Sequence, residues 1–327
     1  MKCGPLVIVG QARSGSTLIT RLMADTRHFF LVNDAYFLQM ADDLCASPTP
    51  ENRLRLAEAC LGRMRQRALT DEVRTVNRSV RLSSADFDDL QAALPGIASE
   101  ADTAWEVIFR LVALAAERAG AKVWGWNSPQ DYVHAQRLLT IRPESRVVFL
   151  IRNPYSVLKS YKNLPRYWGA ERNRYHPLAQ SLVWKAVVRE YERLAALFPG
   201  RLALVRYEDL IVPQSDVWER LADILGPFPA PQPANAYDRN SSHASSQGLS
   251  TTKPLSRVEI GICRAVTSPL AGRLGYEAEG KVTQLGLADL CRSTARFLGY
   301  YSSKAATSRD MRQRLMHFGS RLRHRIQ

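Results

Sequence analysis

The feature that most constrains this chain is a glycine-bounded loop near its N-terminus, GQARSGST at residues 10–17. The apolar run LVIVG precedes the loop, and the segment STLITRLMA, which starts inside it, carries apolar residues at helical spacing. A strand that turns through glycines directly into a helix is the setting of a phosphate-binding loop. The opening residues therefore predict an α/β fold whose first strand ends at an anion site.

The loop departs from the pattern G-x-x-x-x-G-K-[ST] at one position, because Ser16 stands where the pattern has lysine. Arg13, three residues earlier, supplies a cation whose fork suits bidentate contact with phosphate or sulfate oxygens. Ser14, Ser16 and Thr17 add hydroxyl donors. Without the lysine and a recognisable acidic Mg²⁺ element, the equipment for γ-phosphoryl transfer is incomplete. An ordinary Gly/Ser turn is the alternative interpretation.

The rest of the chain alternates strands with helices. Apolar runs predict strands at residues 121–126, 145–152 and 201–210, with helical patterns between them. This succession predicts a P-loop-like parallel β-sheet flanked by helices, with right-handed connections. Residues 41–119 are mostly helix-patterned and predict a helical insertion. We expect a single α/β domain over residues 1–300.

Composition places the chain among ordinary globular proteins and excludes disordered and fibrous classes, with 46% hydrophobic and 23% charged residues. The net charge of +14 and the pI near 9.9 favour anionic ligands, anionic membranes or nucleic acid without choosing among them. No apolar run approaches the roughly 18 residues of a membrane span, and no signal peptide is recognisable. We therefore expect a soluble, cytoplasmic protein.

The five cysteines have no metal-ligand spacing, so we expect reduced thiols and no metal. They are Cys3, Cys45, Cys60, Cys263 and Cys291.

Residues 301–327 combine an apolar stripe with many arginines and predict a basic amphipathic helix. Such a helix either contacts an anionic membrane or acidic partner, or docks its stripe on the core with a solvated basic face.

A second stretch, RVVFLIRNPYSVLKSY, places chemistry at the end of another strand. Arg152 follows the strand directly, and Ser160 lies eight residues later on the next helix. Open α/β sheets bind ligands at the carboxyl ends of their strands, which is where the first loop also lies. Two anion sites at one sheet edge predict a ligand with two separated anionic groups.

Together, RSGST and RVVFLIRNPYSVLKSY resemble the two nucleotide signatures of sulfotransferases that use 3′-phosphoadenosine 5′-phosphosulfate (PAPS). The likeness is closest to the carbohydrate and tyrosylprotein branches, and it covers residues 5–40, 120–215 and, more loosely, 245–277. It implies that the first loop holds the 5′-phosphosulfate, and that Arg152 and Ser160 hold the 3′-phosphate. The implied 5′ site consists of Arg13, Ser14, Gly15, Ser16, Thr17 and Leu18.

The resemblance also assigns roles in the reaction. Arg13 stands where the family has a basic residue that neutralises the leaving 5′-phosphate. Asp34, in LVNDAYF, stands at the position of a glutamate that accepts the proton of the acceptor hydroxyl. Burial near aromatic residues would raise the pKa of this carboxyl, and Arg13 would oppose that shift. The alternative is that Asp34 caps the following helix.

Further positions match the family less closely. Asn127 replaces the lysine of a W-G-x-K-[ST]-P segment, so a second cation near the leaving oxygen is in doubt. Tyr207, in RYEDL, is expected to approach the nucleotide. Ser250 falls where the tyrosylprotein branch has a serine at the reaction centre, and Lys253 is placed to reach the 3′-phosphate. Solvated loop residues are the alternative for both.

These observations favour transfer of a sulfuryl group from PAPS to a hydroxyl, with adenosine 3′,5′-bisphosphate (PAP) as product and no metal. A P-loop nucleotide kinase or NTPase with a degenerate loop is the second hypothesis. A basic, non-catalytic anion-binding protein is the third, although no basic patch interleaved with aromatic residues suggests nucleic acid. The acceptor stays open among glycan, lipid, small metabolite and tyrosine, as does the oligomeric state.

Overall fold

The computed structural model describes residues 3–69, 79–164, 173–212, 216–232, 253–277 and 287–307. The chain divides into two compact units. The first, called here the sheet unit, comprises residues 1–152 and 186–250, and the second, the helical unit, comprises residues 153–185 and 251–327.

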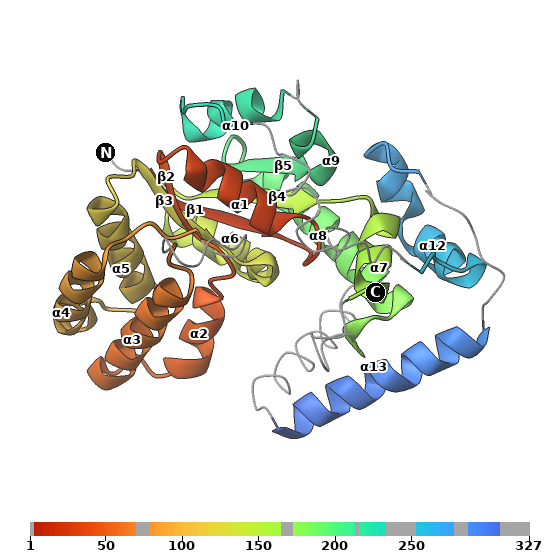
Figure 1. The fold of residues 1–327 in the computed structure, drawn as a ribbon, viewed down its shortest axis with the longest axis horizontal. Helices are drawn as coiled ribbons and strands as arrows, with labels where there is room; N and C mark the ends of the chain where they lie inside the picture. The colour runs from red at the N-terminus through yellow and green to blue at the C-terminus, as the bar shows by residue number, and fades with distance from the viewer. Residues whose placement is uncertain are drawn as a thin grey trace. The chain divides into compact units, whose positions relative to one another are not determined.

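A five-stranded parallel sheet forms the centre of the sheet unit (Figure 1). Its strands lie in the order β2-β3-β1-β4-β5, and every neighbouring pair is parallel. They are β1 (Cys3–Gly10), β2 (Phe29–Val32), β3 (Val123–Asn127), β4 (Arg146–Ile151) and β5 (Leu202–Arg206). The predicted parallel α/β sheet is confirmed. Sequence analysis missed β2, a fully buried strand of four residues that is too short to show a period.

The register brings the carboxyl ends of the strands to one level. Gly10 pairs with Leu150, and Ile8 of the same strand pairs with Asn127. At the other side of β4, Ile151 pairs with Arg206. The residues that leave β1, β3, β4 and β5 therefore emerge at the same edge, which is called here the carboxyl edge. The order reverses at β1, and such a switch point is where open α/β sheets bind ligands.

Four helices fill most of the segment that the sequence predicted to be helical. They are α2 (Phe37–Leu44), α3 (Pro50–Gln66), α4 (Ser84–Glu100) and α5 (Ala104–Arg118), and they lie together on the side of β2 and β3 (Figure 1). Thr49, Ser83 and Thr103 begin the last three of these helices, each accepting a hydrogen bond from a backbone N–H of the first turn. These caps explain why the breaks between the helices fall where they do.

Apolar packing covers both faces of the sheet. One cluster joins β1 to α1 (Ser16–Asp25) and includes Ile8, Ile19 and Met23, all buried. On the opposite face of the sheet, Trp126 is fully buried and stacks on Phe109 of α5, with ring centroids 6.3 Å apart. This tryptophan is therefore part of the core.

The remaining helices of the sheet unit link the strands. A 3₁₀ helix (Pro129–His134) and α6 (Ala135–Ile141) connect β3 to β4. The short α9 (Tyr207–Leu210) and α10 (Val217–Leu225) follow β5. The long α8 (Pro177–Leu197) runs from one unit into the other.

The helical unit contains α7 (Pro154–Lys162), α12 (Arg257–Arg273) and α13 (Leu287–Thr307). A largely buried ion pair joins two of them, because Lys162 Nζ lies 2.7 Å from Glu259 Oε2 and Tyr175 donates to the other oxygen of that carboxylate. Of the predicted basic helix over residues 301–327, the first seven residues belong to α13, and residues 308–327 lie outside the described residues. Within the described ranges, no helix combines the length and hydropathy of a membrane span.

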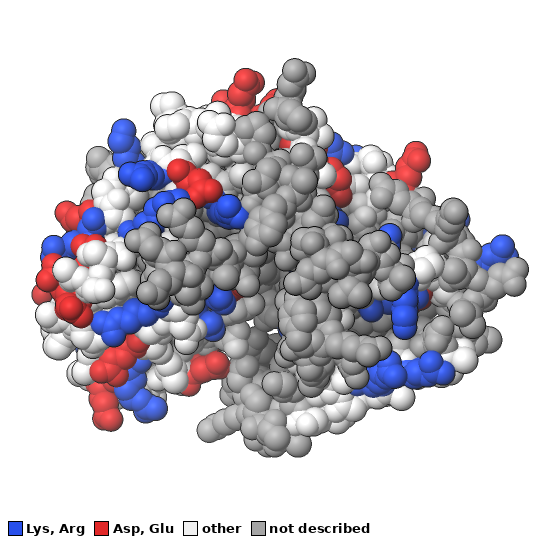
Figure 2. All heavy atoms as spheres, in the orientation of Figure 1, with Lys and Arg blue, Asp and Glu red and all other residues white. Residues whose placement is uncertain are grey.

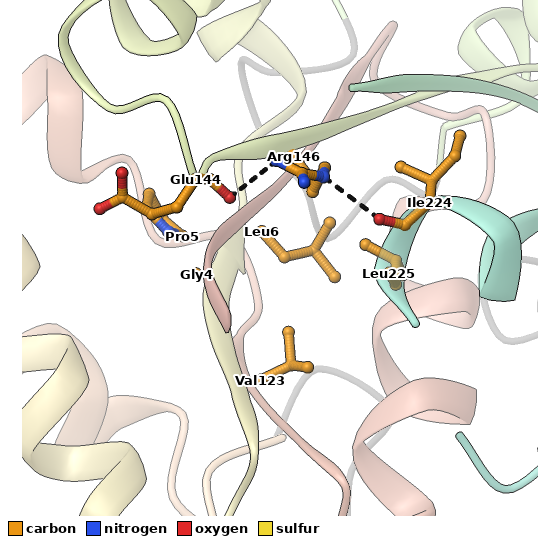
Figure 3. A pocket seen from close by; sticks show the side chains of 8 residues that line it. All are labelled: Gly4, Pro5, Leu6, Val123, Glu144, Arg146, Ile224 and Leu225. Carbon is orange, nitrogen blue, oxygen red and sulfur yellow. Dashed lines mark hydrogen bonds between the residues drawn. The ribbon is translucent and has the colours of Figure 1, made fainter. Parts of the chain in front are cut away.

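A small pocket of about 90 Å³ lies at the opposite, amino end of the strands (Figure 3). Apolar side chains of β1, β3 and α10 line it, together with Arg146 at the start of β4. The lining residues are Gly4, Pro5, Leu6, Val123, Glu144, Arg146, Ile224 and Leu225.

Candidate active site

The loop after β1 is held in a conformation that requires glycine at two positions. At Gly10, a Cβ would lie 2.1 Å from the carbonyl oxygen of Leu150, and φ is 153°. At Gly15, φ is 93°, and a Cβ would lie 2.3 Å from Cδ2 of Tyr207. Arg13 also has a positive φ, 76°, which is unusual for a side-chain-bearing residue. The loop is thus a strained backbone turn packed tightly against its neighbours, as functional loops often are.

The helix that follows the loop leaves its positive end available for an anion. Gly15 is the N-cap of α1, and no side chain caps the first turn. The first turn also contains no acidic residue. A helix N-terminus without a carboxylate or capping hydroxyl attracts anions through its N–H groups and dipole. The uncapped N-terminus of α1 is therefore consistent with the predicted anion site in this loop.

Ser14 provides a direct test of whether an oxyanion fits this loop. Its side chain is fully buried, and its hydroxyl oxygen has no hydrogen-bond partner among the described residues. An unsatisfied buried hydroxyl costs about 1–3 kcal/mol, so a native structure normally gives it a partner. An anionic oxygen bound beside the loop would satisfy it, which makes the loop compatible with the 5′ end of PAPS.

Arg152 lies beside this loop, as the sequence predicted. Its guanidinium stacks on the ring of Tyr207, 4.3 Å from the ring centroid, and Nη1 donates to the carbonyl oxygen of Arg13 over 3.5 Å. The edge of the same ring packs against Gly15. The buried ring of Tyr207 therefore lies between Arg152 and Gly15 and fixes the arginine next to the loop. The sequence predicted only that Tyr207 would approach the nucleotide.

The acidic residues after Tyr207 have structural partners. Asp209 accepts hydrogen bonds from Arg206 at 2.6 Å and from Arg220 at 3.2 Å. Glu208 and Asp209 lie in the first turn of α9. Asp209 therefore serves an ion-pair network at the start of α9.

Two other predicted donor-binding residues, Ser160 and Lys253, belong to the helical unit. Ser160 is buried near the end of α7. The side-chain amide of Asn163 clamps the backbone of Lys253, accepting from its N–H at 2.7 Å and donating to its carbonyl at 3.0 Å. Lys253 itself is exposed. Ser250 lies outside the described residues.

Asp34 occupies a tight turn between β2 and α2. Its φ is 48°, and the next residue but one, Tyr36, is the N-cap of α2, with no capping side chain. The alternative that Asp34 caps this helix is therefore wrong. The turn is fixed from β3, because Tyr36 N–H donates to Ser128 Oγ at 2.7 Å and Ala35 N–H donates to the carbonyl of Asn127. The carboxylate is thus presented at the carboxyl edge by backbone anchors.

Three arginines surround the carboxylate of Asp34. Burial raises its pKa above the usual aspartate value, and the positive charges of Arg67, Arg63 and Arg13, in that order, oppose the rise. Arg67 Nη2 lies 3.7 Å from Asp34 Oδ2. The predicted direction of the shift and the opposing effect of Arg13 are confirmed. The sequence did not point to Arg63 or Arg67, which lie in the last turn of α3 and at its C-cap.

Asn127 has a structural contact where the family pattern has lysine. It is fully buried at the end of β3, and its Nδ2 donates to Asn33 Oδ1 at 2.7 Å. The N–H of Asn33 in turn donates to Ser79 Oγ at 3.0 Å. The amide therefore ties β3 to the residue before Asp34, and this position contributes no positive charge.

Charges of both signs are mixed over the helical segment on the face shown in Figure 2. Basic and acidic side chains alternate there over helices α2 to α5. Several of them form ion pairs with one another, such as Arg110 with Glu100 and Arg118 with Asp89. Among the described residues, no group of three or more His, Cys, Asp and Glu side chains is arranged to hold a metal ion.

Comparison with known proteins adds independent findings. The chain matches the profile of the sulfotransferase family over residues 5–229. Among curated proteins, none matches. Solved structures that resemble it include sulfotransferase STF9 from Mycobacterium avium, with 15% identity, a TM-score of 0.46, and coverage of 86% of this chain and 79% of that one. Sulfotransferase STF1 from Mycobacterium tuberculosis H37Rv has 15% identity, a TM-score of 0.40, and coverage of 83% and 77%.

Proposed function

Because this chain belongs to the sulfotransferase family, we propose that it transfers a sulfuryl group from PAPS to a hydroxyl group of an acceptor. The observation that carries the proposal is the contact of Arg152, Tyr207 and the loop after β1. Arg152 stacks on Tyr207, and Tyr207 packs on Gly15. A fixed cation thus lies next to a helix N-terminus, an arrangement suited to a ligand with two separated anionic groups.

Two groups of residues would hold the donor, which supplies the sulfuryl group and a phosphate that leaves with its negative charge. The loop after β1 would hold the 5′ end, through Ser14, Gly15, Ser16, Thr17 and Leu18. Arg152 and Ser160 would hold the 3′-phosphate, with Lys253 as a further cation. The unpaired hydroxyl of Ser14 supports the first assignment, and the clamp of Asn163 on the Lys253 backbone supports the last.

Arg13 would stabilise the negative charge that develops on the leaving phosphate. It lies within the loop itself, and its guanidinium keeps its charge throughout the physiological pH range. Preorganised charges of this kind typically contribute about 10²–10³-fold to turnover. Since Asn127 supplies no charge, Arg13 would carry this role at the leaving oxygen.

Asp34 would accept the proton of the acceptor hydroxyl. A carboxylate whose pKa is raised by burial is a better base than an exposed aspartate. Its turn is anchored to Asn127 and Ser128, which fixes the backbone that carries the carboxylate. Ser250 would assist at the reaction centre, and the acceptor would be a glycan, a lipid, a small metabolite or a tyrosine.

Transfer of labelled sulfate tests this proposal. The purified protein is incubated with ³⁵S-labelled PAPS and a metabolite and glycan extract of the source cells, with and without EDTA. We expect labelled product and PAP in both conditions. Magnesium-dependent ATP turnover with no sulfate transfer would instead favour the kinase or NTPase hypothesis. Binding of DNA with steep salt dependence and no affinity for PAP would favour the basic, non-catalytic protein.

A further inference from the structure

Two arginines at the end of α3 lie beside the carboxylate that we assign as the base. Arg63 belongs to the last turn of the helix, and Arg67 is the residue that ends it. Residues four apart lie on one face of a helix, so both side chains extend to the same side. Arg67 Nη2 lies 3.7 Å from Asp34 Oδ2, and the Arg63 guanidinium lies over the ring of Tyr36, two residues after Asp34. Both positive charges lower the pKa of Asp34.

The two arginines differ in what they contact. Arg67 Nη2 lies 3.7 Å from Asp34 Oδ2, so this arginine pairs with the base. Arg63 has neutral partners among the described residues. Its Nη1 donates to Gln66 Oε1 over 3.1 Å, and its guanidinium lies 5.7 Å from the ring centroid of Tyr36.

Arg63 also retains an unused donor. Its Nε is buried and has no hydrogen-bond partner among the described residues. A buried guanidinium N–H without an acceptor is unfavourable, and a carboxylate, sulfate or phosphate oxygen is its strongest partner. The Arg63 guanidinium is thus held in place by Tyr36 and Gln66, and neither of them neutralises its charge.

The carboxylate of Asp34 is exposed to three guanidinium groups, those of Arg13, Arg63 and Arg67. The proposed donor, through its leaving phosphate, would offset Arg13, and Asp34 itself offsets Arg67. In this assignment the charge of Arg63, whose partners among the described residues are neutral, is left for the acceptor.

We propose that Arg63 recognises an anionic group, a carboxylate, sulfate or phosphate, that the acceptor carries near the hydroxyl to be sulfated. This inference rests on the proposed function, because it takes Asp34 as the base that faces the acceptor. It narrows the acceptor from any hydroxyl compound to one that is already negatively charged. Arg63 is thus a specificity-determining residue supplied by the helical segment rather than by the sheet.

Arg65 offers a matched control on the same helical turn. It differs from Arg63 by two positions and therefore faces elsewhere, where it contacts α4 through the Phe87 ring and the Phe87 carbonyl. The substitutions Arg63→Gln and Arg65→Gln remove the same charge from the same helix. If only the net charge of the protein matters, both variants should bind the acceptor equally weakly. If Arg63 recognises the acceptor, only Arg63→Gln should bind it more weakly.

The first experiment fractionates the extract on an anion-exchange resin before the sulfation assay. We expect acceptor activity in the retained, anionic fraction and none in the neutral flow-through. With the retained fraction, Arg63→Gln should raise the acceptor KM about 10–100-fold and change kcat less than threefold, and Arg63→Lys should restore part of the loss. Arg65→Gln should match the native protein. Acceptor activity in the neutral fraction, or equal KM values for the two glutamine variants, would overturn the proposal.

The second experiment does not need the natural acceptor. The protein saturated with PAP is titrated with potassium phosphate against potassium chloride at constant ionic strength, and its Tm is recorded. We expect phosphate to raise Tm more in the native protein and in Arg65→Gln than in Arg63→Gln. Equal shifts in all three proteins contradict the inference. Failure of PAP to bind any of them would instead count against the proposed function.

Discussion

Two arginines lie at the opposite ends of strand β4 and have different kinds of partners. Arg146 is the first residue of β4, and Arg152 directly follows its last residue. Both side chains belong to the sheet unit, and both flank the same buried apolar run. Their surroundings differ in kind, and that difference supports our proposal that the carboxyl edge binds the donor.

Arg146 is surrounded by backbone carbonyl groups. Its Nε donates to the carbonyl of Ile224 over 3.1 Å, and its Nη1 donates to the carbonyls of Glu144 and Ser145, both over 3.0 Å (Figure 3). These acceptors come from the loop before β4 and from α10. The guanidinium therefore closes the amino end of the sheet, and its donors are directed at the protein itself.

Arg152 is held by an aromatic face and by the loop. The ring of Tyr207 lies 4.3 Å from its guanidinium carbon, and the carbonyl of Arg13 accepts from Nη1 at the long distance of 3.5 Å. Stacking fixes the plane of a guanidinium and leaves its edges suited to in-plane hydrogen bonds with an oxyanion. Arg13, Gly15 and Asp34 have positive φ at this end, but Arg27, with a φ of 57°, lies before β2 at the other end. The stacked guanidinium is therefore the feature that distinguishes the carboxyl edge.

The largest effect is expected at Asp34. Asp34→Asn removes the proton acceptor while keeping the size of the side chain, so turnover should fall about 10²–10⁴-fold. The affinity for PAP should stay unchanged, because Asp34 faces the acceptor and not the donor in this account. Steady-state kinetics and calorimetry measure the two quantities. Undiminished turnover would remove Asp34 from the role of base.

The second effect separates ligand binding from stability: we expect the Arg152 variant to lose PAP affinity and the Arg146 variant to lose stability. Arg152→Gln should weaken PAP binding about 10–100-fold, as expected for one charge-assisted contact of about 1.5–3 kcal/mol, and change Tm little. Arg146→Gln should lower the free energy of unfolding by about 1–3 kcal/mol and leave PAP affinity unchanged. Chemical denaturation and calorimetry on both variants test this. If both variants lose the same property, the comparison of the two ends fails.

The third effect compares two glycines. Gly15→Ala forces a side chain into a positive-φ position against the Tyr207 ring, so it should reduce stability by about 1–3 kcal/mol and also weaken PAP binding. Gly62→Ala is the control, because a Cβ at that exposed position of α3 meets no atom within 4 Å. It should raise stability by about 0.5–1 kcal/mol, with no effect on PAP. Tolerance of alanine at Gly15 would show that the loop conformation is not essential.

The smallest effect is a shift in pH dependence. Asp34 must be ionised to accept a proton, so the rate should rise as pH increases through its pKa. Arg67 lowers that pKa, and Arg67→Gln should therefore raise it and move the acidic limb of the kcat profile to higher pH. Arg65→Gln should leave the limb in place. A shift to lower pH in Arg67→Gln would contradict the assigned electrostatics.

Much of the carboxyl edge was predictable because its residues follow strands directly. Arg13 and Arg152 come one turn or less after long apolar runs, and parallel strands bring such residues to one edge. The strand β2 was not predictable, because four residues define no period. Asp34 was found only by resemblance to a family, although it follows that strand by two residues.

The partners of Asp34 could not be read from the sequence, for a physical reason. Arg63 and Arg67 lie about thirty residues further along the chain, on a helix whose position depends on tertiary packing of α2 to α5. A basic residue in a last helical turn is equally common as a solvated cation that favours the helix dipole. Likewise, the role of Asn127 depends on a contact with Asn33, ninety-four residues away in the chain.

Calorimetric titration with PAP in metal-free buffer tests the central claim most directly, namely that the carboxyl edge binds a 3′,5′-phosphorylated donor. The account predicts one binding site per chain, an affinity that Arg152→Gln reduces and Arg146→Gln preserves, and much weaker binding of adenosine 5′-phosphate, which lacks the 3′-phosphate. Absence of binding, or equal affinity for the two nucleotides, would contradict it.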